Sequence, residues 1–247
     1  MGPWSTVLAE RVLPVVLAVG LASIHLLAHS ELLLTRISRG RALSFAGGVS
    51  VAYVFVHVLP EIDDFRQPMN QHPLLAVPTE KEVYLVTMLG FITYYGLEQL
   101  ANRSAEQEGD DKPSPGIFRV HVGAYAAYNA IVGYLLFHQE TPGVGSLLLF
   151  AFALGLHFIL NDMTLEDQHE EDYHRTGRWV LAVAVLVGAG IGSVTELHQT
   201  TLGLLFAFLA GGIMLSVVRE ELPAERQGKF WWFTGGVALY TAVLLVT

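Results

Sequence analysis

The stretches AGGVSVAYVFVHVLPE, residues 46–61, and AGGIMLSVVREELPAE, residues 210–225, are two copies of one pattern. Each copy begins with Ala-Gly-Gly, continues through a mostly apolar run and ends at Leu-Pro near a glutamate. Both copies lie in stretches apolar enough to cross a bilayer. A unit that is used twice, once in each direction across the membrane, is typical of an inverted-repeat transport protein. Coincidence is the alternative, because small residues and prolines are common in membrane helices.

The composition of the chain is that of a membrane protein. Of its 247 residues, 52% are hydrophobic and 15% are charged, whereas about 25% of the residues of a soluble domain are charged. The net charge of −9 provides no basic surface for phosphates, so we expect no nucleic-acid partner. Because the chain contains no cysteine, a metal ion could be held only by His, Asp, Glu, Asn or Met side chains.

The apolar residues form eight blocks, each near the ~20 residues that a spanning helix needs. These blocks are residues 9–35, 43–62, 82–101, 118–138, 144–165, 178–197, 200–219 and 230–247. The sequence therefore predicts an all-α polytopic membrane protein with eight transmembrane helices. We expect residues 1–247 to form a single transmembrane domain in the lipid bilayer, in which helices 1–3 and 6–8 are related as an inverted repeat.

The basic residues predict the orientation of these helices. Lysine and arginine collect on the cytoplasmic side of membrane proteins. Eleven of the fourteen basic residues fall in the connections after the first, third, fifth and seventh segments. They are Arg36, Arg39, Arg41, Arg103, Lys112, Arg119, Arg175, Arg178, Arg219, Arg226 and Lys229. The distribution predicts a cell-membrane protein with both termini outside the cytoplasm, and it sends the two repeat copies across in opposite directions.

With this topology, the chain resembles the ZIP (Zrt/Irt-like) family of divalent metal transporters. The segment FAGGVSVAYVFVHVLPE is similar to the second helix of that family, where a Gly-Gly pair precedes His-x-x-Pro-Glu; the matching residues are His57, Pro60 and Glu61. The resemblance implies eight helices, both ends outside, and an inverted relation between the first three and the last three helices. It also implies a transporter and not an enzyme, with a divalent metal ion as substrate, zinc before iron or manganese.

The metal-site motifs of the ZIP family are only partly present. In the fourth helix the family carries His-Asn-x-x-Asp-Gly or Glu-Gly. Here the stretch YNAIVG, residues 128–133, has Tyr128 in place of the histidine, keeps Asn129 and has Val132 in place of the acid. We expect Tyr128 and Val132 to face the interior of the helix bundle, because residues four apart share one helix face.

The fifth helix of the family carries His-Glu-x-x-His or Glu followed by an acid, and it corresponds here to HFILND, residues 157–162. His157 is kept, Asn161 takes the position of the second ligand, and Asp162 fits the following acid. The resemblance thus implies a single metal site with altered selectivity, formed by His157, Asn161, Asp162 and Asn129. Imidazole nitrogen with carboxylate oxygen suits zinc, manganese or iron(II). Hydrogen bonding between helices is the alternative role for these side chains.

Other polar groups leave two interpretations open. His25 and His29, four apart, either line a path or hydrogen-bond neighbouring helices. His57 either attracts cations at an entrance or is solvated at the end of its helix. His121 is expected at the membrane interface, near the inner end of segment 118–138. The acidic connection 166–174 contains two histidines and either tunes ion release or is simply solvated.

Glycines inside the apolar segments predict close helix packing. GAGIG, residues 188–192, and AGG, residues 210–212, are interpreted as packing surfaces because small residues let helix backbones approach in lipid. A hinge is the alternative.

Three functions remain open from the sequence. The first is a divalent metal-ion transporter with altered selectivity. The second is a ZIP-like scaffold that does not transport and has a binding or regulatory role. The third is an intramembrane metal-dependent hydrolase, which would need a metal-activated water. The oligomeric state is open between a monomer and a homodimer.

Overall fold

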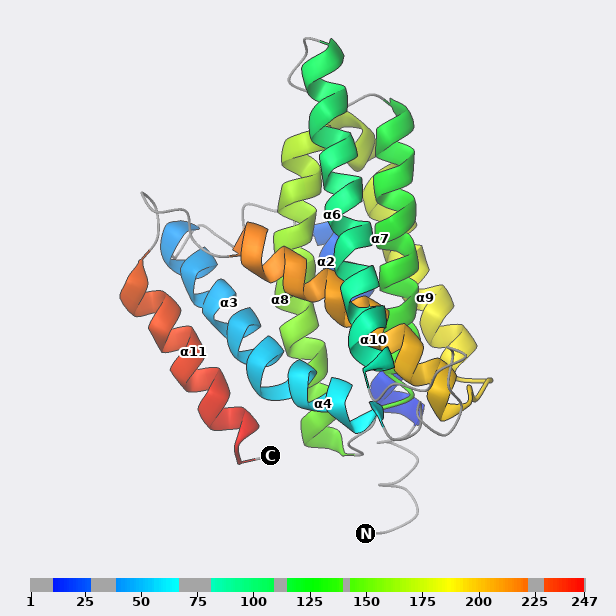
Figure 1. The fold of residues 1–247 in the computed structure, drawn as a ribbon, viewed down its shortest axis with the longest axis vertical. Helices are drawn as coiled ribbons and strands as arrows, with labels where there is room; N and C mark the ends of the chain where they lie inside the picture. The colour runs from blue at the N-terminus through cyan, green and yellow to red at the C-terminus, as the bar shows by residue number, and fades with distance from the viewer. Residues whose placement is uncertain are drawn as a thin grey trace. The chain divides into compact units, whose positions relative to one another are not determined.

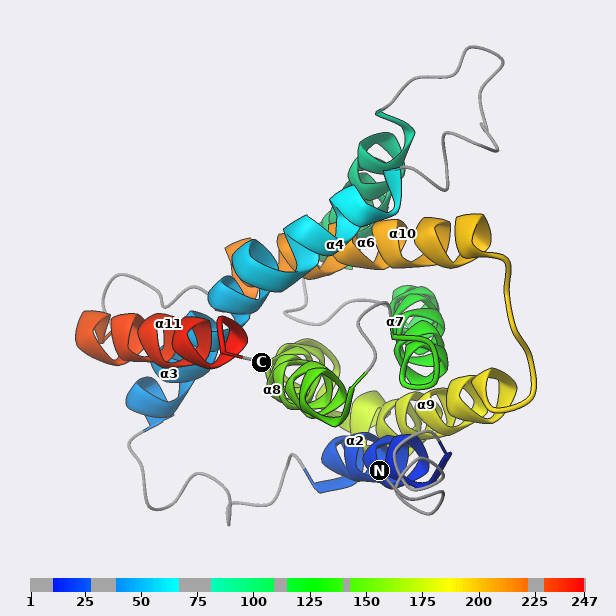
Figure 2. The same ribbon diagram turned by 90° about the horizontal axis from the view of Figure 1, so that it is seen from below.

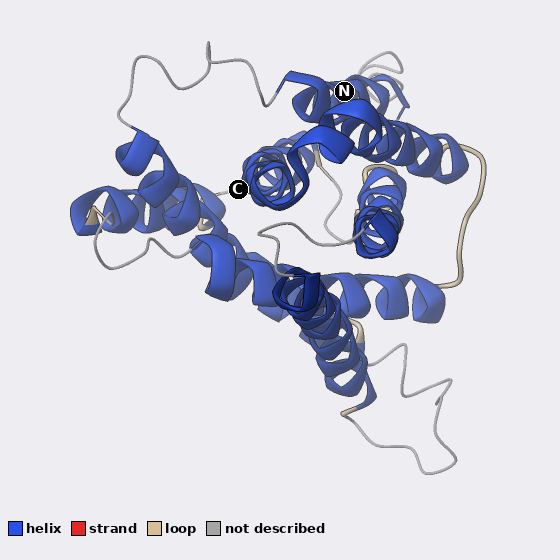
Figure 3. Cartoon of the chain, turned by 90° about the horizontal axis from the view of Figure 1, so that it is seen from above, coloured by secondary structure: helices blue, strands red, loops and turns tan. Residues whose placement is uncertain are grey.

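The computed structural model describes residues 11–27, 39–66, 81–108, 115–139, 143–221 and 229–246. Every regular element within these ranges is helical (Figure 1, Figure 3), which confirms the all-α prediction. The α-helices are α2 (Leu13–Leu27), α3 (Arg39–Tyr53), α4 (Leu59–Asp64), α6 (Glu82–Glu108), α7 (Pro115–Leu135), α8 (Val144–Asp172), α9 (Arg178–Gly192), α10 (Gln199–Ser216) and α11 (Phe230–Leu244). Three π-helical turns complete the set: η3 (Val54–Val58), η4 (Tyr173–Gly177) and η5 (Val217–Glu221).

Part of the described chain has the length and composition of membrane spans. Within the described residues, three continuous helical stretches are long and apolar enough to cross a membrane: 40–64, 144–192 and 199–219. The shorter helices α2 and α11 are also apolar. Large apolar side chains such as Val16 on α2 and Val183 on α9 are exposed, whereas His25 and Asp162 are buried. This distribution suits a lipid solvent, in which polar groups must face the protein interior.

One compact unit consists of α2, the part of α6 from residue 97 onward, α7, α8 and α9. In this unit α2 packs against α8 and α9, and α7 packs against α9 (Figure 2). The contact between α7 and α9 is close because it is made by backbone. A methyl group on Gly133 would meet the Val185 carbonyl, and one on Gly188 would meet the Ala130 carbonyl. The predicted packing role of the GAGIG stretch is therefore confirmed at Gly188.

The second compact unit consists of α3, η3, α4, the N-terminal part of α6, α10, η5 and α11. Two reciprocal glycine contacts hold its helix pairs together. Gly48 of α3 lies against the Phe233 carbonyl of α11, while Gly236 of α11 lies against the Phe45 carbonyl of α3. In the same way, Gly90 of α6 and Gly211 of α10 each lie against the backbone of the other helix. Both Ala-Gly-Gly copies therefore place a glycine at a helix–helix contact.

A π-helical turn follows each Ala-Gly-Gly and precedes a Leu-Pro pair. In the first copy the turn is η3, in which the Leu59 N–H donates to the Val54 carbonyl. Proline at position 60 has no N–H and crowds the carbonyl four residues earlier, so a wider turn just before it relieves the clash. In the second copy η5 ends at Glu221, immediately before Leu222 and Pro223 in the sequence. The two copies thus share a backbone irregularity as well as a sequence pattern.

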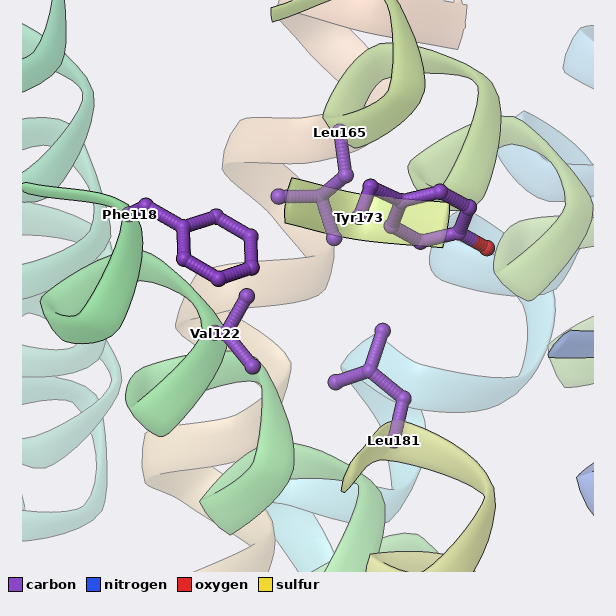
Figure 4. Packing of buried hydrophobic residues seen from close by; sticks show 5 residues of the cluster. All are labelled: Phe118, Val122, Leu165, Tyr173 and Leu181. Carbon is purple, nitrogen blue, oxygen red and sulfur yellow. The ribbon is translucent and has the colours of Figure 1, made fainter. Parts of the chain in front are cut away.

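The stretch 144–192 is a hairpin and not one long span. The backbone leaves the helical conformation at His169 (φ −134°, ψ 28°), and η4 follows. Figure 1 shows that α9 runs opposite to α8 after this turn. Phe118, Val122, Leu165, Tyr173 and Leu181 form a buried cluster that ties α7, α8, η4 and α9 together at the turn (Figure 4). The predicted segment 144–165 is therefore extended by helical residues that the sequence had assigned to a connection.

Candidate functional site

A chain of polar side chains is buried between α2, α7 and α8. The Nδ1 atom of His25 lies 2.9 Å from both carboxylate oxygens of Asp162. On the other side of the same ring, Nε2 of His25 lies 3.0 Å from Nδ2 of Asn129. The exposed fraction of these residues is 2% for His25, 2% for Asn129 and 0% for Asp162. With the Asn129 amide as donor, Nε2 accepts and the proton on Nδ1 is donated to the carboxylate.

A second polar pair lies one turn away on α8. Nδ2 of Asn161 is 3.0 Å from Nε2 of His157, and both residues are buried. The ring of Tyr128, from α7, lies 5.6 Å from the ring of His157. Tyr128 and Val132 are both buried, which confirms that this face of the fourth segment points into the bundle.

An aromatic side chain separates the two polar groups. Phe158 lies 4.8 Å from the His25 ring and 6.2 Å from the Tyr128 ring, measured between centroids. It occupies the position at which the sequence comparison with the ZIP pattern expected a glutamate. A ring at this position supplies apolar packing and no ligand, so the His25–Asp162–Asn129 chain and the His157–Asn161 pair are distinct hydrogen-bonded groups.

Local packing brings α2 close enough to α8 for this contact. Gly155 of α8 lies under Ile24 and Leu21 of α2, where an added methyl group would stand 3.1 Å from Cδ1 of Ile24. Tyr173, at the start of η4, is buried with its hydroxyl close to the Asp162 carboxylate. The turn that joins α8 to α9 therefore closes the site from one side.

The four predicted site residues are divided between the two groups. Asn129 and Asp162 are brought together, but through His25, which was not among the predicted ligands. His157 and Asn161 pair with each other. Of the two roles left open for His25, the structure shows hydrogen bonding to neighbouring helices. A signal for this role existed in the sequence, because His25 is the only ionisable residue within α2.

The ligand chemistry of the site is limited. Within the described ranges, no three His, Cys, Asp or Glu side chains come together as a metal-holding group. In this site, the pair best suited to bind a metal ion is His25 with Asp162, an imidazole and a carboxylate. Asparagine oxygen atoms from Asn129 and Asn161 are the other oxygen donors available nearby.

The remaining candidates take different positions. His57 pairs with Glu61 at 3.2 Å in the second compact unit and is only partly buried. His29 lies outside the described residues. His121 is buried, with an exposed fraction of 2%, and its ring lies against that of His169 near the end of α8. Its position at the membrane interface stays a prediction, because burial within the protein does not define depth in a membrane.

The acidic connection 166–174 is helical on both sides of the break at His169 and carries ion pairs of its own. His174 contacts Glu166 at 3.0 Å, and Arg175 contacts Asp172 at 2.9 Å. A surface cavity of about 600 Å³ is lined by Glu170, Glu171, His174 and Arg175. Its charges are partly compensated and open to solvent, so this surface is a weak site at most.

Comparison with family models, with curated proteins and with solved structures gives no match.

Proposed function

We propose that the chain is a ZIP-like integral membrane protein with eight spans that transports a divalent metal ion, zinc before iron or manganese, with altered selectivity. The observation that carries the proposal is the buried contact between His25 and Asp162, completed by Asn129. An ionised carboxylate inside a membrane bundle is costly unless it is paired or binds a cation. Such groups mark ion pathways more often than they serve packing alone.

The inverted repeat is supported by the directions of the two copies. In Figure 1, α3 and α10 run in opposite directions within the second compact unit. An inverted repeat of helices 1–3 and 6–8 exchanges the second helix with the seventh and the third with the eighth. The glycine contact Gly48/Gly236 joins the second helix to the eighth, and Gly211/Gly90 joins the seventh to the third. The proposed symmetry would therefore superpose each of these two glycine contacts on the other.

The proposed orientation is supported by arginine–aromatic pairs. Arg41 lies over the Trp232 ring and Arg219 over the Tyr95 ring in the second compact unit. Arg178 lies over Trp179 in the first. Each pair falls at a segment end that the charge distribution assigns to the cytoplasmic side. Tryptophan and tyrosine are enriched at membrane interfaces and arginine on the cytoplasmic side, so each pair agrees with the side that the charge distribution assigns to its segment end.

Ion binding at this site would exchange one partner of Asp162 for another. Nδ1 of His25 lies within hydrogen-bond distance of both carboxylate oxygens of Asp162. A cation that reaches Asp162 must displace that contact, after which the carboxylate oxygens and the neighbouring amide oxygens can bind the metal. His157 supplies a further nitrogen if the ring turns away from Asn161. These donors match the nitrogen and oxygen ligands of zinc, manganese and iron(II).

The test is metal-dependent stability together with uptake. Zinc, iron(II) or manganese should raise the unfolding temperature of the purified protein, since a ligand that binds only the folded state stabilises it by mass action. Asp162→Asn should abolish this stabilisation and the uptake into vesicles. His57→Gln, a change at the partly exposed pair of the other unit, should leave both intact. Equal metal response in the parent and in Asp162→Asn would rule out the site.

The scaffold alternative is favoured by one specific observation. His25, Asp162 and Asn129 satisfy one another's hydrogen bonds, so the network is complete without an ion. On this alternative Asp162→Asn lowers stability but the parent binds none of the three metals. Bound metal without flux would also favour a binding or regulatory role over transport.

A further inference from the structure

Two buried histidines meet at the end of the first compact unit, away from the site described above. His121 comes from α7 and His169 from the point where α8 leaves the helical conformation. Their ring centroids are 5.7 Å apart and the ring planes are nearly perpendicular, at 86°. The exposed fraction is 2% for His121 and 5% for His169.

The ring nitrogens of this pair lack hydrogen-bond partners. Within the described residues, neither nitrogen of His121 has a partner, and Nε2 of His169 has none. The backbone of Leu97 lies near His121 without meeting hydrogen-bond geometry. Each buried polar atom without a partner costs about 1–3 kcal/mol. Native proteins rarely leave several such atoms together, so these nitrogens are expected to have a ligand.

The surroundings of the pair are aromatic and apolar. The Phe118 ring lies 5.1 Å from the His169 ring, and the Tyr125 ring lies 6.2 Å from the His121 ring. Phe118 also belongs to the buried cluster of Figure 4. Glu170 and Glu171 follow His169 in the sequence and line a surface cavity, while Asp172 is engaged by Arg175. Among the described residues, no carboxylate joins the two histidines as a third ligand.

We propose that His121 and His169 together bind one Cu⁺ ion. Imidazole is a good ligand for copper, and a chain without cysteine must hold copper through nitrogen or thioether sulfur. A divalent zinc ion takes four ligands in structural sites, and the described residues offer no third histidine or acid here. Cu⁺, a monovalent d¹⁰ ion, can be held by two ligands. It brings half the charge of a divalent ion into an apolar site. The rings are neighbours, with centroids 5.7 Å apart. Bonds of about 2 Å, as imidazole makes to zinc, would hold one nitrogen of each ring within about 4 Å of the other.

This site is independent of the proposed transport function, because it shares no residue with the His25–Asp162–Asn129 chain or with the His157–Asn161 pair. Loss of one site should therefore leave the other able to bind its ion.

The test uses the purified full-length chain in detergent under anaerobic, reducing conditions. Cu⁺ is supplied as its coloured bicinchoninate complex, and transfer to the protein is followed by loss of the colour. We expect one Cu⁺ per chain, and X-ray absorption should show two nitrogen neighbours. His121→Gln and His169→Gln should each weaken the affinity for Cu⁺ by more than about 100-fold. Loss of a residue that only hydrogen-bonds a metal ligand costs up to about 100-fold, and loss of the ligand itself should cost more.

Two controls separate ligation from folding and from general histidine binding. His174→Gln changes a histidine of the same turn that already pairs with Glu166, and it should keep full copper affinity. His25→Gln should also keep it. Helix content and metal-free unfolding temperature of each variant show whether it is folded, and a single-site variant that does not fold is replaced by His→Asn. Copper retained by both site variants, copper lost in His25→Gln, or four-coordinate copper would overturn the proposal.

Discussion

Replacing His25 should expose how much the folded state depends on its contact with Asp162. Both side chains are about 1% exposed, and the contact distance is 2.9 Å. Removing the His25 donor leaves the Asp162 carboxylate buried without this partner. That costs more than the ~1–3 kcal/mol of an unmet neutral hydrogen bond and is comparable to the ~3–5 kcal/mol for a broken buried ion pair. We therefore expect His25→Ala to lower the free energy of unfolding by about 3–5 kcal/mol. Asp162→Asn removes the charge itself, so its cost should be nearer the 1–3 kcal/mol of an unmet hydrogen bond.

The double variant distinguishes coupling from simple loss of packing. With Asp162→Asn already present, His25→Ala no longer leaves an unpaired carboxylate. The loss of unfolding free energy in the double variant should be smaller than the sum of the two single losses by about 2 kcal/mol. This difference is within the range measured for residues in direct contact. The partly exposed pair His174–Glu166, with a similar distance of 3.0 Å, is the matched control. Its coupling should stay below about 1 kcal/mol.

The assay is equilibrium unfolding in mixed micelles of increasing denaturing detergent, with linear extrapolation to zero denaturant. Coincident transitions by helix content and tryptophan fluorescence would justify a two-state treatment. Strictly additive effects of His25→Ala and Asp162→Asn would show that the two side chains do not interact in the folded protein. The assignment of His25 to the site would then be refuted.

Gly48→Ala should destabilise the protein by about 1–3 kcal/mol, because the added methyl group meets the Phe233 carbonyl. In Gly235→Ala the added methyl group meets nothing within 4 Å, so this variant should be neutral or be stabilised by up to about 1 kcal/mol. Thermal unfolding measures both variants. An equal effect of the two substitutions would contradict the packing role of Gly48. Because the chain has no cysteine, single cysteines at Ser38 and Ser104 should be labelled only from the cytoplasmic side and one at Ser193 only from outside. A membrane-impermeant maleimide tests this, and external labelling at Ser104 would reverse the proposed orientation.

The positions of the helices could be predicted because hydropathy is a local property. Each apolar block between 9–35 and 230–247 contains or overlaps a helix of the structure. The segment ends were less predictable. The run from Glu166 to Asp172 is charged, and the sequence assigned it to a connection, yet it is helical on both sides of the break at His169. Charge opposes membrane burial but not helix formation, so hydropathy marks where a span ends and not where its helix ends.

The partners within the site could not be predicted from the sequence. His25 and Asp162 are 137 residues apart, and α2 is apolar on all sides, so no periodicity indicates which face of α2 meets α8. The burial of His121 could not be predicted for the same reason. Its ring packs against that of His169, at the point where α8 leaves the helical conformation.

The reciprocal glycine contacts restrict how the protein can vary. At Gly48 and Gly236 the neighbour is the main chain of the facing helix, not a side chain. A side-chain collision can be relieved by trimming the opposing residue, but a carbonyl group is present whatever residue carries it. A substitution at such a glycine therefore has no second-site suppressor on the facing helix. Selection for revertants of Gly48→Val should return glycine or another small residue at position 48, and not a change in α11.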